Sequence, residues 1–169
     1  MSAVQGARAA DPDRRLSGSP AETEALGEAL APGLGAGDVI SLVGPLGAGK
    51  TCFVAGLARG LGAPARVRSP SFTLLNEYRG RRLLLHLDLY RVEPLEVERL
   101  GLEEQVERGV LVAEWGEKLP PSLRSDALTL RFEILSESAR ALEGRAAGAR
   151  GLELLGLWRT LEPRAARGA

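Results

Sequence analysis

One segment of the chain, residues 44–51, constrains the fold more than any other. Its sequence, GPLGAGKT, fits the phosphate-binding pattern G-x-x-x-x-G-K-[ST] at every fixed position. Glycines allow successive backbone N–H groups to turn toward one anion, and the Lys50 ammonium is a compact charge suited to the β- and γ-phosphates of a nucleotide. The Thr51 hydroxyl is a typical Mg²⁺ ligand in such loops. The segment therefore predicts a phosphate-binding loop between a strand and a helix.

The sequence on each side of the loop supports this prediction. Residues 39–43 (VISLV) form a short apolar run typical of a buried strand, and residues 51–61 place apolar side chains at helical spacing. A helix that begins at the loop adds the partial positive charge of its N-terminus to the anion site. We expect seven residues of this region to bind the nucleotide: Gly44, Gly47, Ala48, Gly49, Lys50, Thr51 and Cys52, with the phosphates over residues 47–51.

Composition places the chain among ordinary globular proteins. Its 169 residues suffice for one domain, and 44% are hydrophobic while 26% are charged. The 22 acidic and 22 basic side chains cancel, which argues against a domain that binds nucleic acid mainly by charge. Cys52 is the sole cysteine, so an internal disulfide is impossible. No apolar run approaches the ~20 residues of a membrane span, so we expect a cytoplasmic protein without membrane association.

We expect one folded domain over residues 19–158. Residues 1–18 have little apolar content and are predicted to be disordered, and residues 159–169 are predicted to form a flexible basic tail. The domain should begin with a helix, because residues 19–22 (SPAE) combine an N-cap serine, a first-turn proline and the glutamate of a capping box.

The rest of the chain predicts a mixed sheet. Strands over residues 73–78 and 83–90 are separated by a turn so short that they must pair as an antiparallel hairpin. Residues 94–108 favour a helix in two pieces. Further strands are predicted at residues 110–113, 127–135 and 152–157. The predicted fold class is therefore α/β, a P-loop NTPase with a mixed, partly antiparallel sheet flanked by helices.

Two acids are candidates for chemistry at the loop. Asp88 shares one face of its predicted strand with His86, and a carboxylate on a core strand needs a partner or a metal. The alternative for Asp88 is an ion pair with Arg91, and for His86 a structural hydrogen bond is favoured over proton transfer. Glu114 directly follows an apolar run, the pattern of a Walker B strand whose acid reaches Mg²⁺ directly or through water.

Two further features flank these acids. Trp115 has two interpretations, one in which it stacks near the nucleotide or seals the site from water, and one in which it only packs in the core. Residues 69–73 (SPSFT) carry three hydroxyls around a proline. Such a loop can hydrogen-bond to phosphate or metal and change order with the nucleotide state, with an ordinary turn as the alternative.

Taken in order, four motifs resemble the TsaE family of bacterial ATPases that act in tRNA threonylcarbamoyladenosine biosynthesis. They are residues 44–51, residues 69–73, the H-x-D-L-Y-R run at residues 86–91 and the A-E-W run at residues 113–115. The similarity extends over about residues 19–120, and the pairing of the last two motifs is its most specific element. The resemblance implies Mg²⁺-dependent binding and hydrolysis of ATP, slow in isolation and stimulated by partners. Those partners would be a TsaB–TsaD complex, which modifies the adenosine beside the anticodon, so tRNA would be contacted indirectly.

The resemblance also implies roles for individual residues. Lys50, Asp88 and Glu114 are the expected catalytic residues, and Thr51, Asp88 and Glu114 are the expected metal ligands. The nucleotide is also expected to approach Thr23 in the first helix, Trp115, and a late Gly-Arg turn matched to Gly144 and Arg145. The chain departs from the family's common residues at three positions, which are Pro45, Cys52 and Ser71, and at Cys52 only the backbone N–H is expected to reach phosphate.

Two other functions fit the same loop. A small-molecule kinase would need an acceptor pocket and an arginine-bearing lid, for which Arg79, Arg81 and Arg82 are candidates. Phosphorylation of an acceptor, against release of ADP and free phosphate, separates this function from an ATPase. A nucleotide-dependent binding module would use the site without appreciable turnover, and turnover measured with and without partners separates it.

Overall fold

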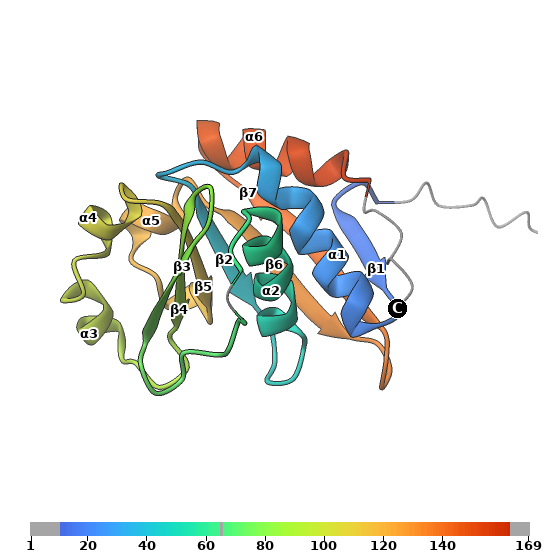
Figure 1. Ribbon diagram of the computed structural model, residues 1–169, viewed down its shortest axis with the longest axis horizontal. Coiled ribbons are helices and arrows are strands. Elements are labelled where there is room, and N and C mark those ends of the chain that lie inside the picture. The colour runs from blue at the N-terminus through green and yellow to red at the C-terminus, as the bar shows by residue number, and fades with distance from the viewer. Residues whose placement is uncertain (1–10, 65, 163–169) are drawn as a thin grey trace, which may run out of the picture.

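The computed structural model describes residues 11–64 and 66–162, in which seven strands form one sheet covered by helices on both faces (Figure 1). The strands are β1 (Arg14–Ser17), β2 (Val39–Val43), β3 (Leu75–Arg79), β4 (Leu83–Asp88), β5 (Val110–Glu114), β6 (Leu128–Ile134) and β7 (Arg140–Ala146). The helices are α1 (Pro20–Leu30), α2 (Lys50–Gly60), α3 (Pro94–Glu98), α4 (Leu102–Val106), α5 (Pro121–Arg124) and α6 (Ala149–Arg159), with 3₁₀ turns at Ala31–Gly33 and Gly116–Lys118.

The sheet has the strand order β1-β7-β6-β2-β5-β4-β3 and is mixed, as the sequence predicts. Strands β4, β5, β2 and β6 are parallel, whereas β3, β7 and β1 join antiparallel at the two sides. The predicted hairpin is the β3–β4 pair, and the helix predicted in two pieces is α3 and α4. The α/β fold class predicted from the sequence is therefore confirmed.

Two hydrophobic clusters hold the layers together. The first joins α1, α2 and α6 to one face of the sheet, and the second joins α3, α4 and α5 to the other face. Alternate residues of a central strand such as β5 therefore enter different clusters: Val110 and Val112 the first, Leu111 and Ala113 the second. Burial on both faces explains why the parallel strands have nearly continuous apolar sequences.

The N-terminal boundary predicted from the sequence is wrong. Residues 14–17, expected to be disordered, form β1, which pairs with β7, and the indole Nε1 of Trp158 donates to the Asp13 carbonyl at 2.7 Å. Few buried apolar side chains mark this edge strand in the sequence, and its Leu16 is 69% exposed. Backbone hydrogen bonds hold the strand in the sheet, and a hydrophobic pattern does not reveal them. Residues 1–10 and 163–169 lie outside the described residues, so the expected disorder there stays a prediction.

The last predicted element is also wrong. Residues 152–157 belong to the helix α6 and not to a strand, while β7 supplies the strand that the prediction lacked. Leu154, Leu155 and Trp158 of α6 recur at helical spacing and all enter the first hydrophobic cluster. The helix packs closely on β7, since a Cβ added at Gly144 would lie 2.6 Å from Trp158 Cδ1.

An ion pair anchors α6 beside the start of β2. Asp38 is 5% exposed, and its two carboxylate oxygens accept from Arg150 Nε and Nη2, both at 2.8 Å. Replacing Arg150 by alanine leaves this carboxylate buried without its cation, so we expect a loss of about 2–3 kcal/mol of stability, because the arginine itself is partly exposed. In thermal unfolding this corresponds to a fall in Tm of roughly 5–10 °C.

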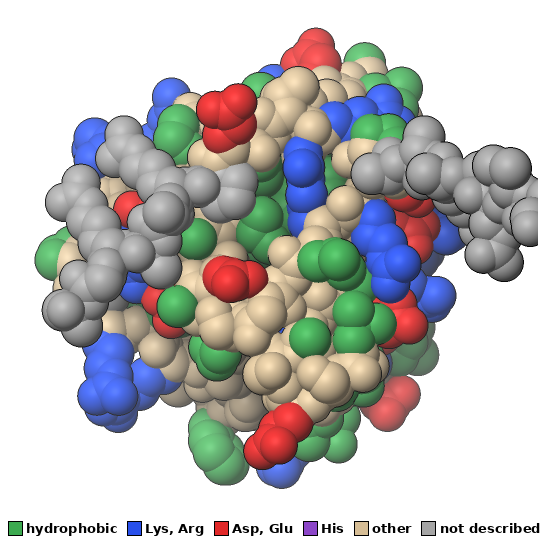
Figure 2. Space-filling view, turned by 90° about the vertical axis from the view of Figure 1, so that its right-hand side faces the viewer, with side chains coloured by type: hydrophobic (Ala, Val, Ile, Leu, Met, Phe, Trp, Pro, Cys, Tyr) green, Lys and Arg blue, Asp and Glu red, His purple; other side chains and the backbone are tan. Residues whose placement is uncertain are grey.

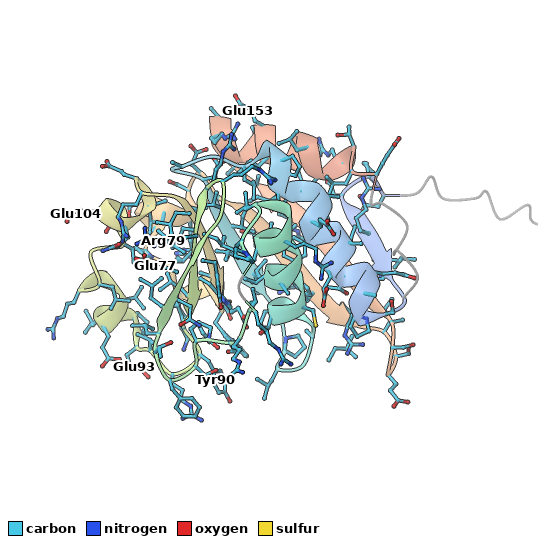
Figure 3. The ribbon with its side chains drawn as sticks, viewed as in Figure 1. Glu77, Arg79, Tyr90, Glu93, Glu104 and Glu153 are labelled. Carbon is cyan, nitrogen blue, oxygen red and sulfur yellow. The ribbon has the colours of Figure 1, made fainter. Side chains whose placement is uncertain are left out.

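The control for this prediction is Glu153, the other acid that pairs with Arg150, at 2.8 Å. Glu153 is exposed at the upper edge of the molecule in Figure 3. Replacing it by alanine should change the free energy of unfolding by less than about 0.5 kcal/mol, because exposed pairs contribute little. Equal losses in the two variants would contradict the assigned importance of the Asp38 contact.

Candidate functional site

The loop between β2 and α2 has the backbone that a phosphate site needs. Gly49 caps the N-terminus of α2 with a φ of 99°, a left-handed conformation that favours glycine. Gly44 adopts a φ of 153°, and a Cβ there would lie 2.8 Å from the Phe132 carbonyl oxygen of β6. Side chains at either position would therefore distort the loop, which explains both fixed glycines of the sequence pattern.

Lys50 is folded back into this loop. The residue is 4% exposed, and its Nζ donates to the carbonyl oxygens of Gly44 at 2.6 Å and Pro45 at 3.0 Å. Burial lowers the pKa of Lys50, and the carboxylates of Glu114, Glu117 and Asp88 act in the opposite direction. The ammonium thus lies inside the loop, hydrogen-bonded to neutral carbonyls. An anionic phosphate is a stronger acceptor and can take their place.

Glu114 connects the loop to the neighbouring strands. It ends β5 opposite Leu42 of β2, which brings its carboxylate to the sheet edge where the phosphate loop begins. Glu114 is 5% exposed, and its Oε1 accepts from Thr51 Oγ1 at 2.8 Å. The same oxygen lies 2.8 Å from Nε2 of His86 on β4. Two predicted metal ligands, Thr51 and Glu114, are therefore in direct contact.

Asp88 lies next to Glu114 in the sheet but contacts a different part of the chain. Its Oδ2 accepts from Ser69 Oγ at 2.8 Å and Ser71 Oγ at 3.1 Å, and its Oδ1 accepts from the Tyr90 N–H at 3.0 Å. Among the described residues it forms no ion pair with Arg91, which instead lies over the Phe72 ring. Asp88 therefore anchors the loop of residues 69–73 beside the site.

Trp115 covers the side of the loop that faces β4. Its ring centroid lies 4.4 Å from Lys50 Nζ and 4.9 Å from the ring centroid of Tyr90, which is labelled in Figure 3 at the lower edge of the molecule. Its backbone φ of 59° is unusual for a bulky residue and costs of order 1–3 kcal/mol. Trp115 thus contacts Lys50 and also packs against the second hydrophobic cluster, so its position is compatible with both of its interpretations.

A pocket of about 140 Å³ opens on the other side of the loop. Its wall comprises Ser19, Pro20, Thr23, Gly47, Gly49, Cys52, Glu137, Ser138 and Arg140. Thr23 reaches it from α1 with its hydroxyl 2.7 Å from Ser17 Oγ, and Arg140 donates to the Gly47 carbonyl at 3.2 Å. The pocket joins the start of α1, the start of α2 and the β6–β7 hairpin, three segments that are far apart in the sequence.

The family is decided by comparison with known proteins. The family described as "Threonylcarbamoyl adenosine biosynthesis protein TsaE" matches residues 17–142, three quarters of the chain. The chain belongs to the TsaE family. The matched residues include every part of the site described above, from Thr23 to Arg140, and the family acts in tRNA threonylcarbamoyladenosine biosynthesis.

Individual members of the TsaE family are similar over most of their length. The chain is 41% identical to the tRNA threonylcarbamoyladenosine biosynthesis protein TsaE of Treponema pallidum over 131 residues, which cover 76% of the chain and 97% of the relative. It is 39% identical to the TsaE protein of Bacillus subtilis, covering 78% of the chain and 84% of the relative. The crystal structure of Bacillus subtilis YdiB superposes with a TM-score of 0.72 at 33% identity, covering 86% of the chain and 92% of YdiB.

The expected TsaE turn at Gly144 and Arg145 is wrong. Both residues lie inside β7, and Gly144 faces Trp158 instead of the loop. The residue that contacts the loop is Arg140, at the start of β7. Arg140 reaches this position because β6 is parallel to β2, so the chain that leaves the end of β6 lies at the same sheet edge as the phosphate loop.

The oxygen donors present suit Mg²⁺ as it binds to nucleotide sites. The described residues hold no group of three or more histidine, cysteine or acidic side chains that could enclose a metal. Mg²⁺ does not need such a group, because it usually takes one or two protein oxygens, several waters and the phosphates of its substrate. The contacting Thr51 hydroxyl and Glu114 carboxylate fit that requirement.

Within the same described residues, no helix has the length and apolarity to cross a membrane.

Proposed function

We propose that this TsaE family member is a Mg²⁺-dependent ATPase that supports a TsaB–TsaD complex in threonylcarbamoyl modification of tRNA. The observation that carries the proposal is the contact between Thr51 and Glu114 beside the loop that holds Lys50. A lysine, a hydroxyl and an acid in this arrangement are the parts that P-loop enzymes use to bind triphosphate and metal. Family membership supplies the choice of pathway.

Each residue of the site has a task in this proposal. The backbone N–H groups of the loop bind the phosphates, and Lys50 exchanges the carbonyls of Gly44 and Pro45 for phosphate oxygens. When bound, Mg²⁺ neutralises the phosphate charge that develops during transfer. Glu114 accepts a hydrogen bond from the Thr51 hydroxyl, which leaves the lone pairs of that hydroxyl free for the metal. Asp88, which accepts from Ser69 and Ser71 in this structure, acts on the attacking water or the metal.

The pocket beside Gly47 and Gly49 is the proposed place of the nucleoside. A nucleotide whose phosphates lie on the loop extends into it along α1, toward Thr23 and Arg140. Cys52 lines the same pocket, and burial raises the pKa of its thiol. We therefore expect Cys52 to react slowly with alkylating agents near neutral pH, since the thiolate is the reactive form.

Bound nucleotide should protect Cys52 from alkylation. Because it is the only cysteine, labelling of the whole chain reports on this pocket without further assignment. We expect Mg²⁺–ADP to lower the labelling rate of the wild-type chain at least about tenfold, as expected when a thiol loses access. Mass spectrometry over a time course measures it, and Lys50→Met provides the control, since weak nucleotide binding should abolish protection. Equal rates with and without nucleotide would place the nucleoside elsewhere.

The arginines considered for a kinase lid lie near the C-terminal end of α2. Arg81 donates its side chain to the Gly60 carbonyl and its backbone N–H to the Leu61 carbonyl, at the C-terminal end of α2. The phosphate loop lies at the opposite end of that helix, and in Figure 3 Arg79 lies on β3 well above Tyr90. The arginines considered as a lid therefore lie away from the phosphates.

On the face seen in Figure 2, basic and acidic side chains are interspersed, in keeping with indirect contact to tRNA.

Phosphate release from ATP tests the proposal. We expect slow release by the isolated chain, because Arg140, the arginine that contacts the loop, is hydrogen-bonded to the Gly47 carbonyl and is not directed at the phosphates. A purified TsaB–TsaD complex should accelerate it. Release that is absent under both conditions, with nucleotide bound, would favour the binding module; rapid release by the isolated chain would argue against partner activation.

A further inference from the structure

The only histidine of the chain is buried against the proposed metal site. His86 lies on β4 with 0% of its surface exposed, and its Nε2 is 2.8 Å from Glu114 Oε1. The β-sheet fixes this contact, because β4 and β5 are parallel neighbours in which His86 lies opposite Val112, two residues before Glu114. On its other side the imidazole packs against Tyr78, with ring centroids 6.1 Å apart. The ring is therefore held from two strands.

The hydrogen-bond pattern determines which ring nitrogen carries the hydrogen. An ionised carboxylate can only accept, so Nε2 must be the donor to Glu114. Nδ1 is buried and has no partner among the described residues. A bare acceptor lone pair at that position costs less than a buried N–H without a partner, which favours the tautomer with its hydrogen on Nε2.

Glu114 Oε1 consequently accepts two hydrogen bonds, one from Thr51 and one from His86. The described residues provide no donor for Oε2. A glutamate side chain has several rotatable bonds, and fixing it in one conformation costs up to about 2 kcal/mol of entropy. The contact with Thr51 depends on a hydroxyl that the proposed metal would also use, whereas His86 is fully buried and is not one of the proposed metal ligands.

We propose that His86 is a positioning residue that holds Glu114 in the orientation required by the metal site. It directs Oε1 toward the Thr51 hydroxyl and leaves Oε2 available to Mg²⁺ or to a water that Mg²⁺ binds. His86 itself touches neither nucleotide nor metal. The inference rests on the proposed function of the site, and it goes beyond that function by assigning the buried histidine to the metal response and not to folding alone. Outer hydrogen bonds of this kind typically change metal affinity or activity by 10–100-fold.

Two substitutions separate the donor from the volume of the ring. His86→Leu fills the buried space without a hydrogen-bond donor. His86→Gln places an amide N–H near the position of Nε2 and so keeps a donor for Glu114. Calorimetric titration with ADP, in excess Mg²⁺ and in EDTA, then measures how much Mg²⁺ strengthens nucleotide binding in each protein, without any catalytic step.

We expect Mg²⁺ to strengthen ADP binding to the wild-type chain, and His86→Leu to reduce that gain by about 10–100-fold. Affinity in EDTA should stay the same, and His86→Gln should recover most of the gain. An undiminished gain in His86→Leu, or no recovery in His86→Gln, would overturn the inference and leave the proposed function intact. A wild-type chain that binds ADP equally with and without Mg²⁺ would remove the proposed function and this inference together.

Nuclear magnetic resonance of the wild-type chain decides the matter even if a variant does not fold. With one histidine, ¹⁵N-labelled imidazole gives a single set of ring signals that needs no assignment. We expect a protonated Nε2 and an unprotonated Nδ1, in slow exchange with solvent. We also expect the Nε2 signal to shift when Mg²⁺ is added to the ADP-bound chain. A hydrogen on Nδ1, or a ring that does not respond to Mg²⁺ in a chain that binds Mg²⁺–ADP, would overturn the inference.

Discussion

Replacing Lys50 by alanine is expected to reduce ATP turnover by about 10²–10³-fold, the usual cost of removing one group that stabilises transition-state charge. The ammonium already lies inside the loop on the carbonyls of Gly44 and Pro45, so it reaches the phosphates without entering from solvent. Its desolvated position strengthens the interaction with an anion, because a partly buried charge is less screened by water. Steady-state phosphate release, with the TsaB–TsaD complex present, measures the effect.

Lys50→Met separates charge from packing in this experiment. Methionine keeps an apolar stem against Trp115 and removes only the ammonium, so turnover should fall as far as in Lys50→Ala. Arg124→Ala is the charge-matched control, since Arg124 is exposed and precedes β6, at the sheet edge opposite the phosphate loop. A Lys50 variant that retains wild-type turnover while binding nucleotide would contradict the role given to the loop.

The sequence predicts the centre of the fold well because that information is local. The strand, glycine loop and helix around Lys50 follow from residues adjacent in the chain, and the hairpin of β3 and β4 follows from one short turn. The errors concern contacts between distant segments. The strand β1 is held mainly by backbone pairing with β7, and α6 carries an apolar pattern that fits a strand or a helix until its packing on Gly144 is known.

The site shows the same division. Thr51 and Glu114 are predicted as separate motifs, but their contact depends on β2 and β5 being neighbours in the sheet. Arg140 was missed because its proximity to Gly47 depends on the β6–β7 hairpin, where the sequence has no recognisable motif. For the hydroxyls of residues 69–73 the sequence leaves two interpretations open, a loop that binds phosphate or metal and an ordinary turn, and in this structure two of them donate to Asp88.

Because Ser69 and Ser71 are bound to Asp88, Glu114 is the acid whose replacement should have the most direct effect on the metal site. Replacing Glu114 by glutamine is expected to lower Mg²⁺-dependent turnover by about 10²–10³-fold while ADP affinity in EDTA stays unchanged. The glutamine amide oxygen can still accept from Thr51 and His86, so the buried donors keep their partner and the chain should fold. What is lost is the negative charge that favours the metal beside the Thr51 hydroxyl.

Phosphate release over a range of Mg²⁺ concentrations, together with calorimetry, separates this effect from a folding defect. Glu114→Gln should require more Mg²⁺ and remain slow at saturation. Glu117→Gln is the matched control, because the Glu117 carboxylate, like that of Glu114, acts to raise the pKa of Lys50. Glu117 lies in the 3₁₀ turn, and in the described structure the Thr51 hydroxyl donates to Glu114 and not to Glu117. If Glu114→Gln keeps the wild-type Mg²⁺ response, the metal is held by another acid. Asp88 is then the remaining candidate, since it lies opposite Glu114 in the sheet and needs only to lose the hydroxyls of Ser69 and Ser71.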